Sequence, residues 1–200
     1  MTRDRIFTAA KALLAQEGLS GLSIRKIARD VGLSPMAVYR HFADKEAIIN
    51  ALMQDGIGAW EDRVMAIEAS DPLIWLDDQM NAFLAFALDE PHRFDAAFFL
   101  PASKARQFPE DFAAGRSKGV GLMIAHIEMA QRSGRIDTTP ALDIALTLVA
   151  LAQGMVSMHR ARRFSTDEQF QSLFRATLRR SLACYRIATP VEASASAATP

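Results

Sequence analysis

The segment that decides the fold is residues 23–42, which read SIRKIARDVGLSPMAVYRHF. Apolar anchors stand on both sides of a short central turn: Ile24, Ile27, Val38 and Phe42. Ala28 is small enough to stand where two helices cross closely, and Gly32 accepts the backbone dihedral angles that a tight turn requires. This order of residues predicts a helix-turn-helix, a motif whose second helix is free to enter the major groove of DNA.

Helical signals surround this segment on both sides. Before it, a first helix is predicted by apolar residues that recur at spacings of three and four: Ile6, Ala9, Ala10, Leu13 and Leu14. Gly18 follows as a natural stop. Ser34 can cap the second helix of the motif, and Pro35 fits its first position, where a missing N–H costs nothing. Asp44 predicts the cap of a longer fourth helix over about 45–69.

The remainder of the chain also has helical periodicity and no sustained strand alternation. Prolines and one glycine separate further predicted helices at about 73–89, 92–100, 109–133, 140–162 and 167–187. The sequence therefore predicts an all-α fold, in which a three-helix N-terminal domain is joined by a connector helix to a C-terminal helical bundle. The expected parts are residues 1–48, residues 49–188 and a disordered tail at 189–200, which is rich in small and polar residues.

Composition narrows the class of protein only slightly. The 23 basic and 23 acidic residues cancel, yet residues 1–47 alone carry a net charge of +3, which is a weak indication that this part meets phosphate. The single cysteine, Cys184, excludes an internal disulfide and suits a reducing compartment. The polar N-terminus shows no secretory signal, and Asp143 and Gln153 interrupt the most apolar stretch, 141–158. We expect a cytoplasmic protein without a membrane span.

Residues 1–48 resemble the DNA-binding domain of the TetR family. The shared pattern is S-x-x-x-I-A-x-x-x-G-x-S-x-x-x-x-Y-x-H-F-x-x-K-E, which stands here as Ser23, Ile27, Ala28, Gly32, Ser34, Tyr39, His41, Phe42, Lys45 and Glu46. The preceding Gly18-Leu19 and the first amphipathic helix match as well. The resemblance is specific over about a quarter of the chain, and the rest is similar only in length, helix count and helix order.

The resemblance implies a DNA-contacting set: Ser23, Arg25, Ser34, Pro35, Met36, Ala37, Tyr39, Arg40, His41 and Lys45. Tyr39 and His41 would hydrogen-bond phosphates, and Lys45 would add charge at a helix N-terminus, where backbone amides already attract anions. Ser23 can cap the first helix of the motif, which is the second helix of the chain, and can also contact phosphate. Arg25 and Arg40 can each reach either a base or a phosphate.

The first turn of the recognition helix departs from the commonest family pattern. Met36 and Ala37 stand where Gly and Thr are frequent, so a hydroxyl is missing from the position where base contact is expected. Both side chains are apolar and can meet only a thymine methyl group or a groove wall. The departure changes the expected sequence preference but not the expected binding of DNA.

For the C-terminal body, the resemblance implies an effector cavity and a twofold dimer on a palindromic operator in double-stranded DNA. Large apolar side chains suit an apolar or aromatic effector, so the candidate pocket set is Trp75, Phe83, Phe86, Phe98, Phe99, Met123, His126, Met155 and His159. The last two long helices would form the dimer interface, with Leu148, Leu151, Met155, Phe170, Phe174, Leu178 and Leu182 as candidates. Repression relieved by the effector is the usual mode in this family.

Two other functions remain open from the sequence. A helical ligand-binding or scaffolding protein could keep the DNA-binding shape without binding tightly. A helical-bundle enzyme is the second alternative, but the chain has no Gly-rich phosphate loop, G-x-S-x-G, H-E-x-x-H, C-x-x-C or E-x-x-H pattern. We therefore predict no catalytic residues, no metal site and no cofactor.

Overall fold

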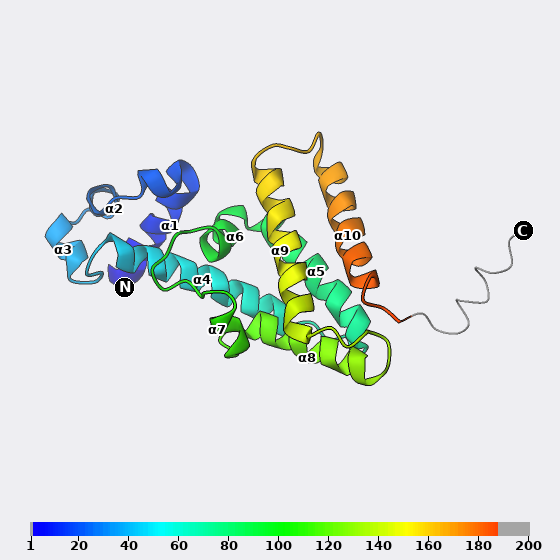
Figure 1. Cartoon of the computed structure of the whole chain (residues 1–200). Coiled ribbons are helices and arrows are strands. Elements are labelled where there is room, and N and C mark those ends of the chain that lie inside the picture. The colour runs from blue at the N-terminus through cyan, green and yellow to red at the C-terminus, as the bar shows by residue number, and fades with distance from the viewer. Residues whose placement is uncertain (1, 188–200) are drawn as a thin grey trace, which may run out of the picture. The chain divides into compact units, whose positions relative to one another are not determined.

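The computed structural model describes residues 2–187, and within them all regular structure is helical (Figure 1). The helices are α1 Thr2–Gly21, α2 Ile24–Asp30, α3 Pro35–Tyr39, α4 Lys45–Met65, α5 Pro72–Asp89, α6 Pro91–Phe98, α7 Glu110–Ala113, α8 Lys118–Arg132, α9 Ala141–Arg160 and α10 Asp167–Ala183. The all-α expectation is confirmed. The tail expected at 189–200 lies outside the described residues.

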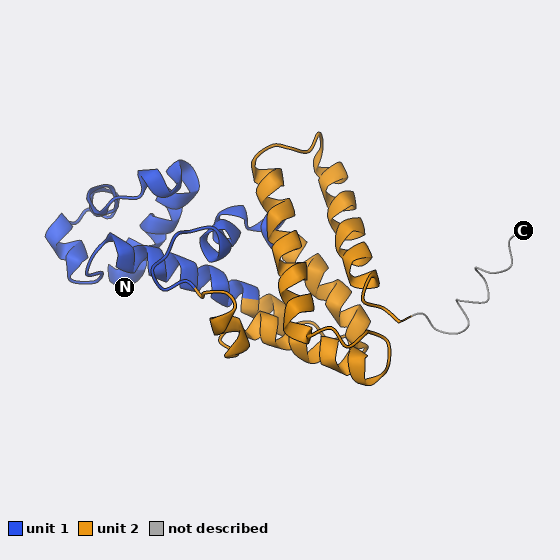
Figure 2. Ribbon diagram, in the orientation of Figure 1, with its two compact units in different colours: residues 1–60, 86–105 blue, residues 61–85, 106–200 orange. Residues whose placement is uncertain are grey.

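The chain divides into two compact units (Figure 2). Among the described residues, unit 1 comprises 2–60 and 86–105, and unit 2 comprises 61–85 and 106–187. The divisions fall inside α4 and α5, so each of these helices contributes to both units. The boundary expected at residue 48 stays a prediction.

The core of unit 1 is built from the apolar residues that the N-terminal pattern singles out. Fully or almost fully buried side chains come from α1, from both helices of the motif and from the first turns of α4: Ile6, Ala10, Leu13, Ile24, Ile27, Ala28, Val38, Phe42, Ile48 and Leu52. Gly18 has a φ of 67° and interrupts α1, after which one further turn reaches Gly21. The predicted stop is therefore confirmed, although a short helical turn follows it.

Three side chains cap helix starts in unit 1. Ser23 Oγ accepts a hydrogen bond from Lys26 N at 3.2 Å, and Ser34 Oγ accepts one from Ala37 N at 3.2 Å. Asp44 Oδ1 accepts one from Ala47 N at 2.7 Å. Each acceptor satisfies an amide that the helix itself cannot pair, so the caps predicted at Ser34 and Asp44 are confirmed.

A close crossing holds α6 against α4 in unit 1. A Cβ atom on Gly56 would lie 2.5 Å from the backbone oxygen of Arg93 and 2.9 Å from the backbone nitrogen of Ala97. The Arg93 guanidinium donates to Asp55 at 2.8 Å and to Glu90 at 3.1 Å. Glycine is therefore required at position 56 because the two backbones approach too closely for a side chain.

Unit 2 packs α9 against both α8 and α10. The side chains that fill this packing are almost completely buried: Ile127, Ile144, Leu148, Val156, Phe170, Phe174 and Leu178. Arg179 donates to both carboxylate oxygens of Asp77, at 2.6 and 2.7 Å, and thereby joins α10 to α5. This hydrogen-bonded pair lowers the pKa of the Asp77 carboxyl below its usual value.

The helix predicted over 109–133 is wrong as one element, because the structure has α7 and α8 there. Gly115 has a φ of 69°, which ends the short α7. Ser117 then begins a new helix, since its hydroxyl accepts from Val120 N at 3.5 Å. The fourth helix is also shorter than expected and ends at Met65.

By length and composition alone the stretch around 141–158 is more apolar than expected, but one such helix is weak evidence for a membrane span. Helix α9 has 20 residues and a mean hydropathy of 1.7, which is enough to cross a bilayer. Core helices of soluble proteins pass the same test, and α9 packs against two neighbouring helices of its own unit. About 28% of the residues in its apolar window are buried, most of the others are half-buried, and Met158 is 50% exposed.

The α4–α6 crossing gives a stability test with a matched control. We expect Gly56→Ala to lower the free energy of unfolding by about 1–3 kcal/mol, because a backbone must move to accept the methyl group. Gly58→Ala adds the same methyl group to the same helix in open space, so it should raise stability by about 0.5–1 kcal/mol. Urea denaturation followed by circular dichroism measures both. Equal effects of the two substitutions would contradict the close crossing.

Candidate nucleic-acid interface

The helix-turn-helix is formed by α2, the turn at residues 31–34 and α3. Ala28 is 1% exposed at the contact between the helices, and Gly32 has a φ of 69° in the turn. Leu33 N donates to the backbone oxygen of Ala28 at 2.8 Å, which closes the turn onto the end of α2. Pro35 is the first residue of α3, as predicted, where its lack of an N–H leaves no bond unmade.

The side chains proposed to contact DNA lie on the surface of unit 1. Exposed members are Arg25, Ser34, Pro35, Met36, Tyr39, Arg40, His41 and Lys45, and the half-buried members are Ser23 and Ala37. Met36 is 69% exposed and Tyr39 is 45% exposed, although both are large side chains with mainly apolar surface. Single apolar side chains are common on protein surfaces, so this exposure shows only that Met36 and Tyr39 are accessible to a partner.

Several basic side chains near the motif are already engaged within unit 1. Lys26 pairs with Glu17, Arg29 pairs with Asp30, and Arg5 Nη2 donates to the backbone oxygen of Val31 at 2.9 Å. Arg25 and Arg40 are exposed, and the described residues offer them no ion pair. They therefore keep their guanidinium groups available for phosphate or base edges.

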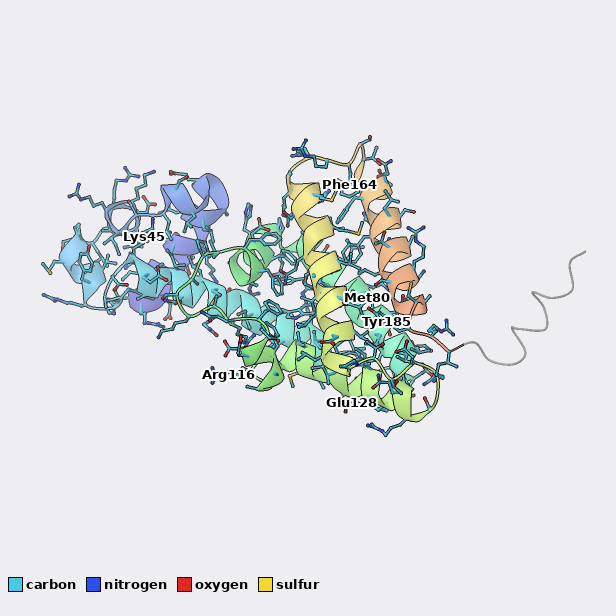
Figure 3. The ribbon with its side chains drawn as sticks, viewed as in Figure 1. Lys45, Met80, Arg116, Glu128, Phe164 and Tyr185 are labelled. Atoms are coloured by element: carbon cyan, nitrogen blue, oxygen red, sulfur yellow. The ribbon has the colours of Figure 1, made fainter. Side chains whose placement is uncertain are left out.

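Lys45 is the first residue of α4, and Figure 3 labels it near the motif. Its Nζ lies 3.5 Å from the backbone oxygen of Leu19, which places the ammonium beside the end of α1. The Asp44 carboxylate already occupies the amide of Ala47 at this helix start. The exposed ammonium group of Lys45 adds positive charge at this helix start and can donate to an anion.

One cation-π contact joins two residues that are far apart in the sequence. The guanidinium carbon of Arg3 lies 4.8 Å from the centre of the Phe42 ring, and so attaches the start of α1 to the end of the motif. Arg3 and Phe42 are 39 positions apart, and no local pattern links them. Phe42 is 3% exposed, as expected for a core residue.

The nine candidate pocket residues fall into both units. Phe86, Phe98 and Phe99 belong to an aromatic cluster of unit 1 that also contains Trp60 and Phe94. In unit 2 the rings of His159 and Phe170 stack with their centres 4.1 Å apart. Also in unit 2, Phe83 and Met123 are buried and Met155 is half-buried.

Trp75 and His126 are the two candidates that line a common groove in unit 2, of about 580 Å³. Its other lining residues were not among the candidates: Val64, Met65, Ile67, Ala69, Lys118, Gly121 and Leu122. Four of the nine candidates are buried, namely Trp75, Phe83, Phe86 and Met123, whereas Phe99 is 38% exposed. The groove is formed by the end of α4, the segment after it, the first turn of α5 and α8, so it is a tertiary feature.

The candidate dimer residues are mostly in the core of unit 2. Leu148, Phe170, Phe174, Leu178 and Leu182 are all less than 8% exposed within the single chain, whereas Leu151 and Met155 are half-buried. Their regular spacing reflects packing of α9 against α10 inside one protomer. A partner subunit would have to contact other side chains of these helices, such as Met158 and Leu173, which are 50% and 39% exposed.

Within residues 2–187, no three His, Cys, Asp or Glu side chains lie close enough together to hold a metal ion. The described residues thus contain a helix-turn-helix with exposed cationic and apolar side chains, and a second helical unit with an apolar groove. These features define the class of helix-turn-helix regulators with a helical second domain.

Family models identify this class more closely. The model described as "Bacterial regulatory proteins, tetR family" matches residues 6–52, and the model described as "Tetracyclin repressor-like, C-terminal domain" matches residues 76–181. Because the second match alone covers more than half of the chain, the chain belongs to the tetR family of bacterial regulatory proteins. The recognition made from residues 23–46 is confirmed.

Individual relatives are more distant. The chain is 36% identical over 52 residues to the HTH-type transcriptional regulator UidR of Escherichia coli K12, a match that spans 26% of each chain. It is 26% identical over 141 residues to Rv1816 of Mycobacterium tuberculosis H37Rv, which covers 68% of this chain and 59% of that relative. A solved protein of unknown function from Rhodococcus sp. RHA1 has the same fold, with a TM-score of 0.74 and 22% identity over 94% of this chain and 96% of that one.

Proposed function

We propose that the chain is a homodimeric repressor that binds a palindromic operator in double-stranded DNA and is released by a small, largely apolar effector. The observation that carries the proposal is the exposed surface of the helix-turn-helix, where Met36, Tyr39 and Arg40 project from α3 and its end. A protein of this kind acts in the cytoplasm, where its DNA lies.

Phosphate contacts would supply most of the affinity. The Tyr39 hydroxyl, the His41 ring and the Lys45 ammonium are all exposed, and each can donate a hydrogen bond to a phosphate oxygen. Ser23 uses its hydroxyl oxygen to cap α2, which leaves the hydroxyl proton free to donate to phosphate. These contacts would fix the orientation of α3 in the major groove without reading the sequence.

Base reading would depend on fewer groups. Met36, at 69% exposed, can cover a thymine methyl group, and Ala37 can approach a base edge closely because its side chain is small. Arg25 and Arg40 can each form a bidentate contact with guanine. The absence of a hydroxyl at position 37 makes methyl contacts more important than hydrogen bonds on this first turn.

A dimer is supported by the uncovered apolar surface of α9 and α10. Most residues in the apolar window of α9 are not fully buried within the chain, and Met158 and Leu173 are 50% and 39% exposed. A twofold axis through this surface would pair two recognition helices with half-sites about 34–36 Å apart, one turn of the double helix. The effector would favour a dimer with a different spacing, through its differential affinity for the two states.

A scaffolding or ligand-binding protein with the same fold is the second candidate. It would keep the buried anchors of the motif but would not need exposed Met36 and Tyr39 or unpaired guanidinium groups at Arg25 and Arg40. A gel shift on DNA fragments selected from a random pool separates the two candidates. If none of the selected fragments gives a salt-dependent shift, the proposed regulator is contradicted.

Lys45 should be a phosphate contact. We expect Lys45→Ala to weaken binding by a similar factor on all sequences and to reduce the slope of log K against log salt by about 1, because one counterion fewer is released. Fluorescence anisotropy over a salt series measures the slope. Lys104→Ala is the matched control, since this exposed lysine of unit 1 bonds Asn50 only through its backbone N–H and should leave the slope unchanged.

Arg25 distinguishes base reading from phosphate binding. If it contacts a guanine, Arg25→Ala should cost about 1–3 kcal/mol on the selected operator and relax the preference at one base pair only. Competition between the operator and single-base variants measures this preference. An equal loss on all variants would show that Arg25 contacts phosphate instead.

Leu173 tests the dimer surface. We expect Leu173→Glu to raise the dissociation constant of the dimer at least about tenfold, because the interface would have to bury an unpaired charge. Sedimentation velocity measures the change. Ile74→Glu introduces the same charge at a 57% exposed apolar residue of α5 and should leave the dimer intact. Dimerisation that survives Leu173→Glu would place the interface elsewhere.

A further inference from the structure

The groove in unit 2 combines an apolar lining with one cation. It is lined by Val64, Met65, Ile67, Ala69, Trp75, Lys118, Gly121, Leu122 and His126, and its volume of about 580 Å³ lies within the usual range for small-molecule sites. Lys118 is the one charged residue in this lining. A ligand that matches the groove would be mainly apolar with a single polar end.

Two stacked rings form a fixed part of the lining. The Trp75 indole and the His126 imidazole lie with their centres 3.9 Å apart and their planes within 2° of parallel. His126 Nδ1 lies 2.9 Å from the backbone oxygen of Leu122, and this nitrogen must donate because a carbonyl oxygen only accepts. The hydrogen bond holds the imidazole against Trp75, so this part of the groove is formed before a ligand arrives.

The end of α4 contributes a flexible part of the groove lining. Met65 is 64% exposed although its side chain is large and apolar, and it lines the groove together with Val64. An exposed Met adapts its shape readily to an apolar guest. Covering this surface would release water from apolar groups, which favours an apolar body over a polar one.

Lys118 and Arg106 share a single carboxylate partner, so the ion-pair cluster has one positive charge more than it has negative charges. Lys118 Nζ lies 3.6 Å from Glu61 Oε2, and Arg106 Nη2 lies 3.0 Å from Glu61 Oε1. One carboxylate is thus shared by two cations, so it cannot neutralise both. The Lys118 side chain is 66% exposed and can turn toward a second anion without losing buried contacts.

We propose that this groove binds a small apolar monocarboxylate, with the hydrocarbon body between Trp75 and Met65 and the carboxylate at Lys118. The inference rests on the proposed function, because it assigns the chemical class of the effector. Binding at Val64 and Met65 would act on the last turn of α4, whose first residue is Lys45 of the candidate DNA interface.

The first experiment separates the charge from the apolar body. Octanoate and 1-octanol share the hydrocarbon chain, and binding of each is followed by the fluorescence of Trp75 in the Trp60→Phe chain, which retains one tryptophan. We expect octanoate to bind more tightly than octanol. Lys118→Met should weaken octanoate about tenfold and leave octanol unchanged, since only the charged contact is removed. Equal binding of octanoate with and without Lys118 would overturn the assignment.

The second experiment fills the groove. A Cβ atom on Gly121 meets no other atom within 4 Å, so Gly121→Leu can be accommodated by α8 while its side chain occupies the space. Both probes should then lose binding. Gly58→Leu makes the same change at another open helical position and should leave both probes bound. Circular dichroism confirms that each variant is folded, and octanoate binding that persists in folded Gly121→Leu would contradict the site.

A DNA-binding assay on the same samples distinguishes this inference from the proposed function. Lys118→Met should bind the selected operator as the unchanged chain does when octanoate is absent. A chain that binds operator but not octanoate would overturn the groove assignment alone. A chain that binds octanoate through Lys118 but binds no DNA would overturn the proposed regulator and leave the groove assignment standing.

Discussion

The close contact between α2 and α3 is the constraint on which the DNA-binding unit depends. Two short helices can hold a fixed crossing angle only if a small side chain lies between them and the turn closes tightly. Ala28 meets the first condition at 1% exposure, and Gly32 meets the second with a φ of 69°. The contact buries Val38 and leaves Met36 and Tyr39 on the outside. The same geometry that stabilises the motif thus determines which side chains can reach DNA.

Helix α4 extends this constraint along the chain. Its first turn is capped by Asp44, its middle is clamped to α6 at Gly56, and its last turn contributes Val64 and Met65 to the groove. Ser103 N donates to Glu46 at 2.7 Å and Lys104 N donates to Asn50 at 3.0 Å, so the segment after α6 is also attached to α4. These hydrogen bonds hold the segment after α6 against the first turns of α4.

Local signals made the N-terminal third of the fold predictable. Ser34, Pro35 and Asp44 act within three residues of their own positions, so their roles follow from the sequence alone. The groove and the ion pairs did not follow, because they join distant residues. Arg179 and Asp77 are 102 positions apart, and nothing near either of them specifies the other. Phe170 and Phe174 are buried within the single chain, and helical spacing indicates an apolar face but not whether that face meets its own chain or a partner.

The energetic requirement on regulation is modest. An effector needs a coupling of only about 1–3 kcal/mol to change operator affinity by roughly 5- to 150-fold. One charge-assisted hydrogen bond, together with the burial of one exposed Met side chain under the ligand, can supply an energy of this size. Both interactions must then form in one state of the protein and not in the other. Met65 meets this condition better than Trp75, because Trp75 is 3% exposed and already stacked without a ligand. The variable part of the site is therefore the end of α4, and the fixed part is the stacked pair against which a ligand would hold it.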